Sequence, residues 1–67
     1  MSLRDVMANQ IKKWRARRAL SQQALADKSG VSREYIARIE LGQHDPTLST
    51  IEKLAKALKV KPGRLLE

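Results

Sequence analysis

The chain has 67 residues, which is enough for one small domain. It contains no cysteine and one histidine, so disulfide cross-links and the usual four-ligand structural zinc sites are excluded, and we expect no metal or cofactor. Fourteen lysines and arginines against seven aspartates and glutamates give a net charge of +7, which favours a polyanionic partner such as nucleic acid but can also serve solubility.

Apolar residues recur with a helical period and nothing alternates with period two, so the sequence predicts an all-α fold. The first helix begins at Leu3. Its apolar stripe is formed by Leu3, Met7, Ile11 and Trp14. The segment QQALADKS forms a second helix, which Ser21 caps at the N-terminus and Gly30 ends.

A third helix follows Ser32, its N-cap, and runs to about Leu41 before Gly42. The segment QHDPTLS is a predicted loop, because a residue before proline avoids the helical region. The fourth helix spans roughly residues 48–58, and either Thr47 or Ser49 caps it.

Pro62 suits the first position of a short final helix that contains Leu65 and Leu66, although Gly63 weakens it. We therefore expect a compact five-helix bundle. Residues 1–67 would form a single DNA-binding domain, with a helix-turn-helix at about 21–41 and no second domain after it.

The third helix has one apolar and one polar side. At 100° per residue, Ile36 and Ile39 lie on the buried side and Glu34 and Arg38 point away. Arginine can bond guanine in bidentate fashion and glutamate can accept from the cytosine amino group, so this face has the chemistry for reading base edges. The alternative is a surface ion pair between Glu34 and Arg38, worth about 0.3–0.5 kcal/mol.

The stretch LSQQALADKSGVSREYIARIELGQHDPTLSTIEKLAKALKV, with IKKWRARRA before it, resembles the Cro and lambda-repressor-like (XRE-type) helix-turn-helix family. The similarity covers about Ile11 to Leu66. It rests on the Ser-Gln opening of the second helix, the Gly-Val-Ser turn and the Ile-x-x-Ile-Glu-x-Gly segment. The resemblance implies a DNA-binding protein whose third helix lies in the major groove.

The resemblance also implies roles at matched positions. The residues expected to contact bases are Ser32, Arg33, Glu34 and Arg38. Gln22 matches a phosphate-holding residue at the start of the second helix, and Gln23 is a weaker candidate for the same role. Tyr35 either contacts the DNA backbone or packs at the flank of the helix. His44 is a loop residue expected near the DNA backbone or in solvent.

Glu40 lies at the edge of the buried face, where an unpaired carboxylate is costly. The family pairs it with an arginine of the first helix, and Arg15 is the matching position, so we expect a structural ion pair. Ala19 departs from the family, which often has Gly, Asn or Lys there. Alanine would be mildly strained at this position if φ is positive.

The sequence predicts no enzyme, because it has no thiol and its one histidine lies in a turn. It favours a cytoplasmic transcriptional regulator that binds double-stranded DNA. No apolar run approaches the ~20 residues of a membrane span, and MSLRDVMANQ lacks the apolar region of a signal peptide. An antitoxin with a toxin partner, or an interaction-only helical module, would keep the same helices and stays an alternative.

We also expect a homodimer on a palindromic operator, because a single small reading helix gives limited specificity. The recognition helices of the two subunits would then lie one turn of DNA apart, ~34–36 Å. The predicted dimer surface is the C-terminal part of the chain, with Leu48, Leu65 and Leu66.

Overall fold

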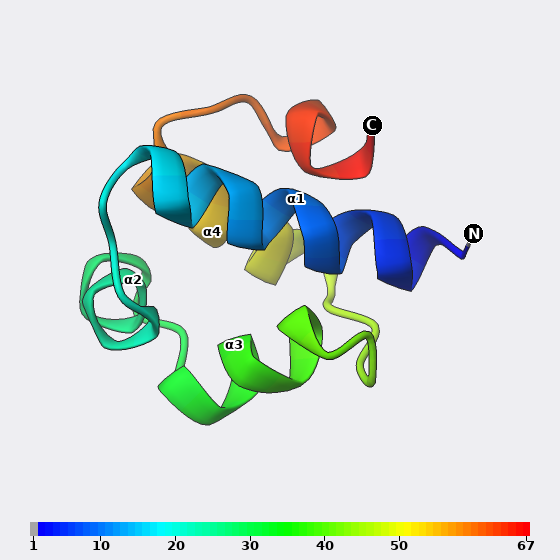
Figure 1. The fold of residues 1–67 in the computed structure, drawn as a ribbon, viewed down its shortest axis with the longest axis horizontal. Helices are drawn as coiled ribbons and strands as arrows, with labels where there is room; N and C mark the ends of the chain where they lie inside the picture. Colours follow the sequence, from blue (N-terminus) through cyan, green and yellow to red (C-terminus); the bar gives the residue numbers. More distant parts are fainter. Residues whose placement is uncertain (1) are drawn as a thin grey trace.

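The structure is a computed structural model that describes residues 2–67, in which helices joined by turns and loops are the regular elements and no strand occurs (Figure 1). Its elements are α1 (Leu3–Arg17), α2 (Gln22–Ser29), α3 (Arg33–Glu40), α4 (Leu48–Leu58) and the 3-10 helix η1 (Pro62–Leu66). None of these helices combines the length and the apolarity that crossing a bilayer requires. The all-α prediction is confirmed for residues 2–67.

The predicted bundle of five α-helices is wrong in its last member, because η1 is a 3-10 helix. Pro62 occupies its first turn, and Gly63 follows within a segment of only five residues. The Arg64 N–H bonds the Lys61 carbonyl at 2.9 Å, which is the i to i+3 pattern of a 3-10 turn. A short segment with proline and glycine cannot gain enough i to i+4 bonds to become an α-helix.

A residue with a hydroxyl side chain caps the N-terminus of each of the four α-helices in the described residues. Ser2, Ser21, Ser32 and Thr47 each accept a hydrogen bond from the backbone N–H three residues ahead. At α4 the Thr50 N–H donates to Thr47 Oγ1 at 3.2 Å, so Thr47 rather than Ser49 is the cap. Such caps satisfy donors that the first helical turn leaves free, which fixes where each helix starts.

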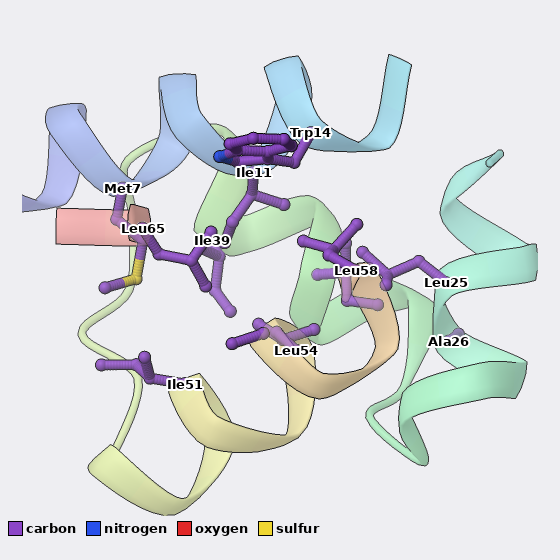
Figure 2. Close-up of a cluster of buried hydrophobic side chains, with 12 residues drawn as sticks. Met7, Ile11, Trp14, Leu25, Ala26, Ile39, Ile51, Leu54, Leu58 and Leu65 are labelled. Atoms are coloured by element: carbon purple, nitrogen blue, oxygen red, sulfur yellow. The ribbon is translucent and has the colours of Figure 1, made fainter. Parts of the chain in front are cut away.

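The hydrophobic core is formed by side chains from one face of each α-helix and by Leu65 of η1 (Figure 2). Fully buried side chains come from every element. They are Ile11, Leu25, Ile36, Ile39, Leu54, Leu58 and Leu65. Leu3, predicted to extend the stripe of α1, is 62% exposed instead. It lies in the first turn of α1, at the end of the helix that projects past the rest of the fold in Figure 1.

Four described residues have positive φ angles, and one of them is Lys59, which ends α4 at φ 60°. Gly30 ends α2 at φ 78° and Gly42 follows α3 at φ 72°. A Cβ at Gly42 would also lie 3.0 Å from Asp5 Oδ1, so both conformation and space favour glycine there. Ala19, between α1 and α2, has φ 55°. This is the positive φ at which alanine was expected to be strained.

Candidate nucleic-acid interface

A tight turn places α3 directly after α2. Gly30 takes the left-handed conformation, and its N–H bonds the Ala26 carbonyl at 2.9 Å. Ser29 Oγ accepts from the Val31 N–H at 3.1 Å, and Val31 packs against the core. Ser32 then caps α3 by accepting from the Tyr35 N–H at 3.1 Å. This local bonding sets the direction in which α3 leaves the turn.

α3 divides into an inner and an outer face. The inner face has Ile36 and Ile39, which are 0% and 1% exposed, so burial of two isoleucines anchors the helix on the core. The outer face consists of exposed residues at which the sequence predicts DNA contacts. They are Ser32, Arg33, Glu34 and Arg38. All four side chains are therefore accessible to an external ligand.

Apart from Ser32, whose Oγ caps α3, the polar side chains of the outer face have no partner within residues 2–67. Glu34 and Arg38 do not form the surface ion pair that the sequence allowed, and Arg33 has no salt bridge or side-chain hydrogen bond either. Two guanidinium groups and one carboxylate are thus free to bond an external ligand. Arginine forks match guanine or phosphate, and a carboxylate accepts from cytosine.

A partly buried ion pair ties the end of α3 to α1. Arg15 donates to Glu40 through Nε at 2.7 Å and Nη2 at 2.9 Å, the pair expected from the family resemblance. The third nitrogen, Nη1, donates to the Leu20 carbonyl at 3.0 Å. Glu40 is 6% exposed, and the hydrogen bonds to its carboxylate raise the pKa of Arg15 above its ordinary value.

Gln22 joins this pair, a contact that the sequence analysis missed. Its amide nitrogen donates to Glu40 Oε1 at 3.1 Å, so the first residue of α2 is tied to the last residue of α3. Gln23, the weaker phosphate candidate, is exposed and donates to Asp27 Oδ1 at 3.0 Å. The i, i+4 spacing of Gln23 and Asp27 could have suggested that bond from the sequence.

Tyr35 and His44 contact each other. Their ring centroids are 4.5 Å apart at an interplanar angle of 72°, an edge-to-face arrangement. Tyr35 also packs against the core, so its ring connects α3 to the following loop and to the interior. Both residues are half-buried, which leaves part of each side chain accessible beside the outer face of α3.

A second ion pair fixes the same loop to α1. Arg4 Nη2 donates to Asp45 Oδ2 at 2.7 Å, and Arg4 Nε bonds Asp45 Oδ1. The hydrogen bond from Arg4 lowers the pKa of Asp45 below its ordinary value. The two residues are 41 positions apart, so no local sequence pattern connects them.

A helix-turn-helix family profile matches residues 11–65. The control protein C.SmaI of Serratia marcescens is 38% identical over 98% of this chain and 79% of its own length. The immunity repressor of Bacillus phage phi105 is 42% identical over 90% of this chain, which spans only 42% of that protein. The crystal structure of the restriction-modification controller protein C.AhdI from Aeromonas hydrophila has a TM-score of 0.89 at 35% identity, covering 92% of this chain and 94% of that one.

Proposed function

The chain belongs to the helix-turn-helix family of DNA-binding transcriptional regulators, and from this premise we propose that it reads a specific operator with α3 in the major groove. The observation that carries the proposal is that Arg33, Glu34 and Arg38 are exposed and have no side-chain partner within residues 2–67. Arg33 and Arg38 would bond base edges, with Glu34 between them as an acceptor. Ser32, at the first turn, would approach a base or the adjoining phosphate.

Contacts to the DNA backbone would flank that helix. The N-terminus of α2 offers free N–H groups and a positive dipole end to a phosphate. Gln22 keeps its side chain on Glu40, so we propose that its backbone N–H, with that of Gln23, holds the phosphate. Tyr35 and His44 would contact the backbone on the other flank, through the hydroxyl and the imidazole.

We further propose that the protein binds as a homodimer. The chain measures 28 Å along its longest axis, less than the ~34–36 Å between successive major-groove faces, so one copy cannot read two half-sites. Three exposed leucines, Leu3, Leu48 and Leu66, line a groove of about 280 Å³ with Met7 and Ile51. Leu65, which the sequence placed in the dimer surface, is fully buried and belongs to the core. Exposed apolar side chains of this kind mark an interaction surface.

The test is selection of bound sequences from a random duplex library. The proposal expects a two-fold symmetric consensus with half-site centres about one DNA turn apart. Selected pools without any consensus would contradict sequence-specific reading, and a consensus of one unrepeated half-site would contradict the dimer.

A second proposal concerns the system that is regulated. Similarity to C.SmaI covers nearly the whole of this chain and most of that control protein, and C.AhdI matches over nearly its full length. We infer that this protein controls restriction-modification genes. The selected consensus should then occur upstream of such genes beside its own, and its absence there would contradict this assignment.

A further inference from the structure

Four cationic groups surround the ring of Trp14. Lys13 Nζ lies 5.6 Å from the ring centroid, and the guanidinium carbons of Arg17, Arg18 and Arg64 lie at 5.1, 5.2 and 5.7 Å. The ring attracts each cation by about 0.5–1 kcal/mol at an exposed site, but like charges so close together repel one another. An external anion would relieve this repulsion.

The positive surface continues from Arg18 onto α2 and α4. A shallow depression beside Arg18 is also lined by Lys28 and Lys59. It adjoins a second depression in which Lys53 and Lys56 join the same two lysines. Neither depression has a carboxylate in its lining. We call this surface the basic stripe: Lys13, Arg17, Arg18, Arg64, Lys28, Lys53, Lys56 and Lys59.

The Trp14 end of the basic stripe lies away from α3. Arg64 belongs to η1 and contacts the Trp14 ring, so this cluster lies on the η1 side of α1. In Figure 1, η1 and α3 are on opposite sides of α1. A duplex docked on the outer face of α3 would therefore lie across α1 from this cluster, in which Arg18 already donates to the carbonyls of Leu58 at 2.8 Å and Lys59 at 3.5 Å.

Most of the cations of the basic stripe have no salt bridge to another of the described residues. Within residues 2–67, the salt bridges involve Arg4, Arg15 and Arg64, and only Arg64 belongs to the stripe. Its partner Glu67 is exposed and lies 3.4 Å away, a contact of little strength in water. Eight of the fourteen lysines and arginines of the sequence thus belong to the basic stripe, whose Trp14 end lies across α1 from α3.

We propose that the basic stripe binds the phosphate backbone of a second stretch of duplex DNA, without sequence preference, while α3 is on the first. Protein partners are held mainly by buried aromatic or arginine anchors in pockets, but Trp14 is only 8% exposed and the depressions are shallow. A phosphate backbone requires only cations along its path, and guanidinium forks suit it well. This inference goes beyond operator reading and rests on the proposed function only for the duplex held by α3, because the stripe's own binding is measured in a variant without the reading arginines.

The experiment uses a variant without the reading arginines, R33A/R38A, and a short duplex of random sequence. Trp14 is the single tryptophan and lies within the basic stripe, so its emission reports binding there. We expect the variant to bind the duplex with a change in Trp14 emission. Adding R17Q/K56Q should weaken that binding about tenfold. It should also make log K less dependent on log salt, reducing the magnitude of the negative slope by about 1.8, since each lost phosphate contact contributes about 0.9.

The matched control is K12Q/K61Q, which removes the same charge from residues outside the basic stripe and should have a much smaller effect. In the otherwise unchanged protein, a bead-bound duplex should capture a second, labelled duplex, and R17Q/K56Q should reduce the capture. Equal losses in the stripe and control variants would overturn the proposal, because net charge alone would then explain binding. An emission response to polyglutamate but not to the duplex would overturn it in favour of an acidic protein partner.

Discussion

The carboxylate of Glu40, the last residue of α3, accepts two hydrogen bonds from the guanidinium of Arg15 in α1, at 2.7 and 2.9 Å. Gln22 at the start of α2 donates a third, at 3.1 Å. One side chain therefore holds together the three helices that position the DNA-binding face. Directional bonds fix the angle of α3 more narrowly than apolar contacts do, because a small rotation of the helix would break them.

Removing this carboxylate should destabilise the fold. Glu40→Ala leaves the Arg15 guanidinium and the Gln22 amide without their acceptor, and we expect a loss of about 2–4 kcal/mol in the free energy of unfolding. Urea denaturation followed by circular dichroism measures it. Glu40→Gln, which keeps one acceptor oxygen and the side-chain volume, should lose less. An unchanged melting temperature in Glu40→Ala would show that the pair contributes nothing.

Arg33→Ala tests direct reading by α3. We expect a loss of about 1–3 kcal/mol on the selected operator and a relaxed preference at one base pair, because a bidentate contact to one base disappears. Arg33 is exposed and has no side-chain partner among residues 2–67, so stability should not change. Equal weakening on operator and random DNA would instead assign Arg33 to the phosphate backbone.

Leu48→Glu tests the proposed dimer surface. Leu48 is 76% exposed in the first turn of α4, where a carboxylate is favourable to the helix dipole. The monomer should therefore keep its stability while the dimer dissociates more readily, as seen by sedimentation. Affinity for a full operator should fall much more than affinity for a half-site. Unchanged sedimentation would place the dimer surface elsewhere.

Acid should weaken the link between the loop and α1. Because the folded state lowers the pKa of Asp45, its pair with Arg4 contributes to stability above the ordinary pKa of 3.8 and loses that contribution as pH falls through the lower folded value. Asp45→Asn should therefore be less stable than the unchanged protein at neutral pH and match it in strong acid. A difference that stays constant from neutral pH to about pH 2 would exclude this titration.

Ala19→Gly should stabilise the protein by about 0.5–1 kcal/mol. The residue has φ 55°, and glycine removes the steric cost that a Cβ has in this conformation. Part of that gain is offset because glycine raises the conformational entropy of the unfolded chain. Ala16→Gly, three residues earlier within α1, should have the opposite sign. Thermal unfolding of the two variants compares them directly.

Helix positions were predictable because the signals are local. Ser21, Ser32 and Gly30 mark boundaries that the structure reproduces. The apolar stripe of α1 was predictable except at Leu3, which is exposed. Periodicity shows which residues share a face of a helix, but not how far along the helix its neighbours cover that face. The 3-10 form of η1 follows from its five-residue length and from Gly63. Both features are visible in the sequence, but they were not enough to distinguish a 3-10 helix from an α-helix.

Contacts between residues far apart in the sequence were harder to predict than helix positions. Arg15 and Glu40 could be paired only through the family resemblance, and the Arg4–Asp45 pair had no signal at all. Gln22 illustrates a different limit: its position at the start of α2 was predicted, but which group its amide bonds depends on how α2 packs beside α3. Base contacts at Arg33 and its neighbours remain predictions, because they need DNA to be seen.

The separation of the two faces of α3 has a consequence for how such a protein could change its target. The contacts that hold the helix in place come from its inner face, Glu40, Tyr35 and the Ser32 cap. The side chains of Arg33, Glu34 and Arg38 bond nothing in residues 2–67. Substitutions at Arg33, Glu34 and Arg38 can therefore alter the preferred sequence with little loss of stability. The domain is a scaffold on which new operator preferences can be selected, in the laboratory or in evolution, without rebuilding the core.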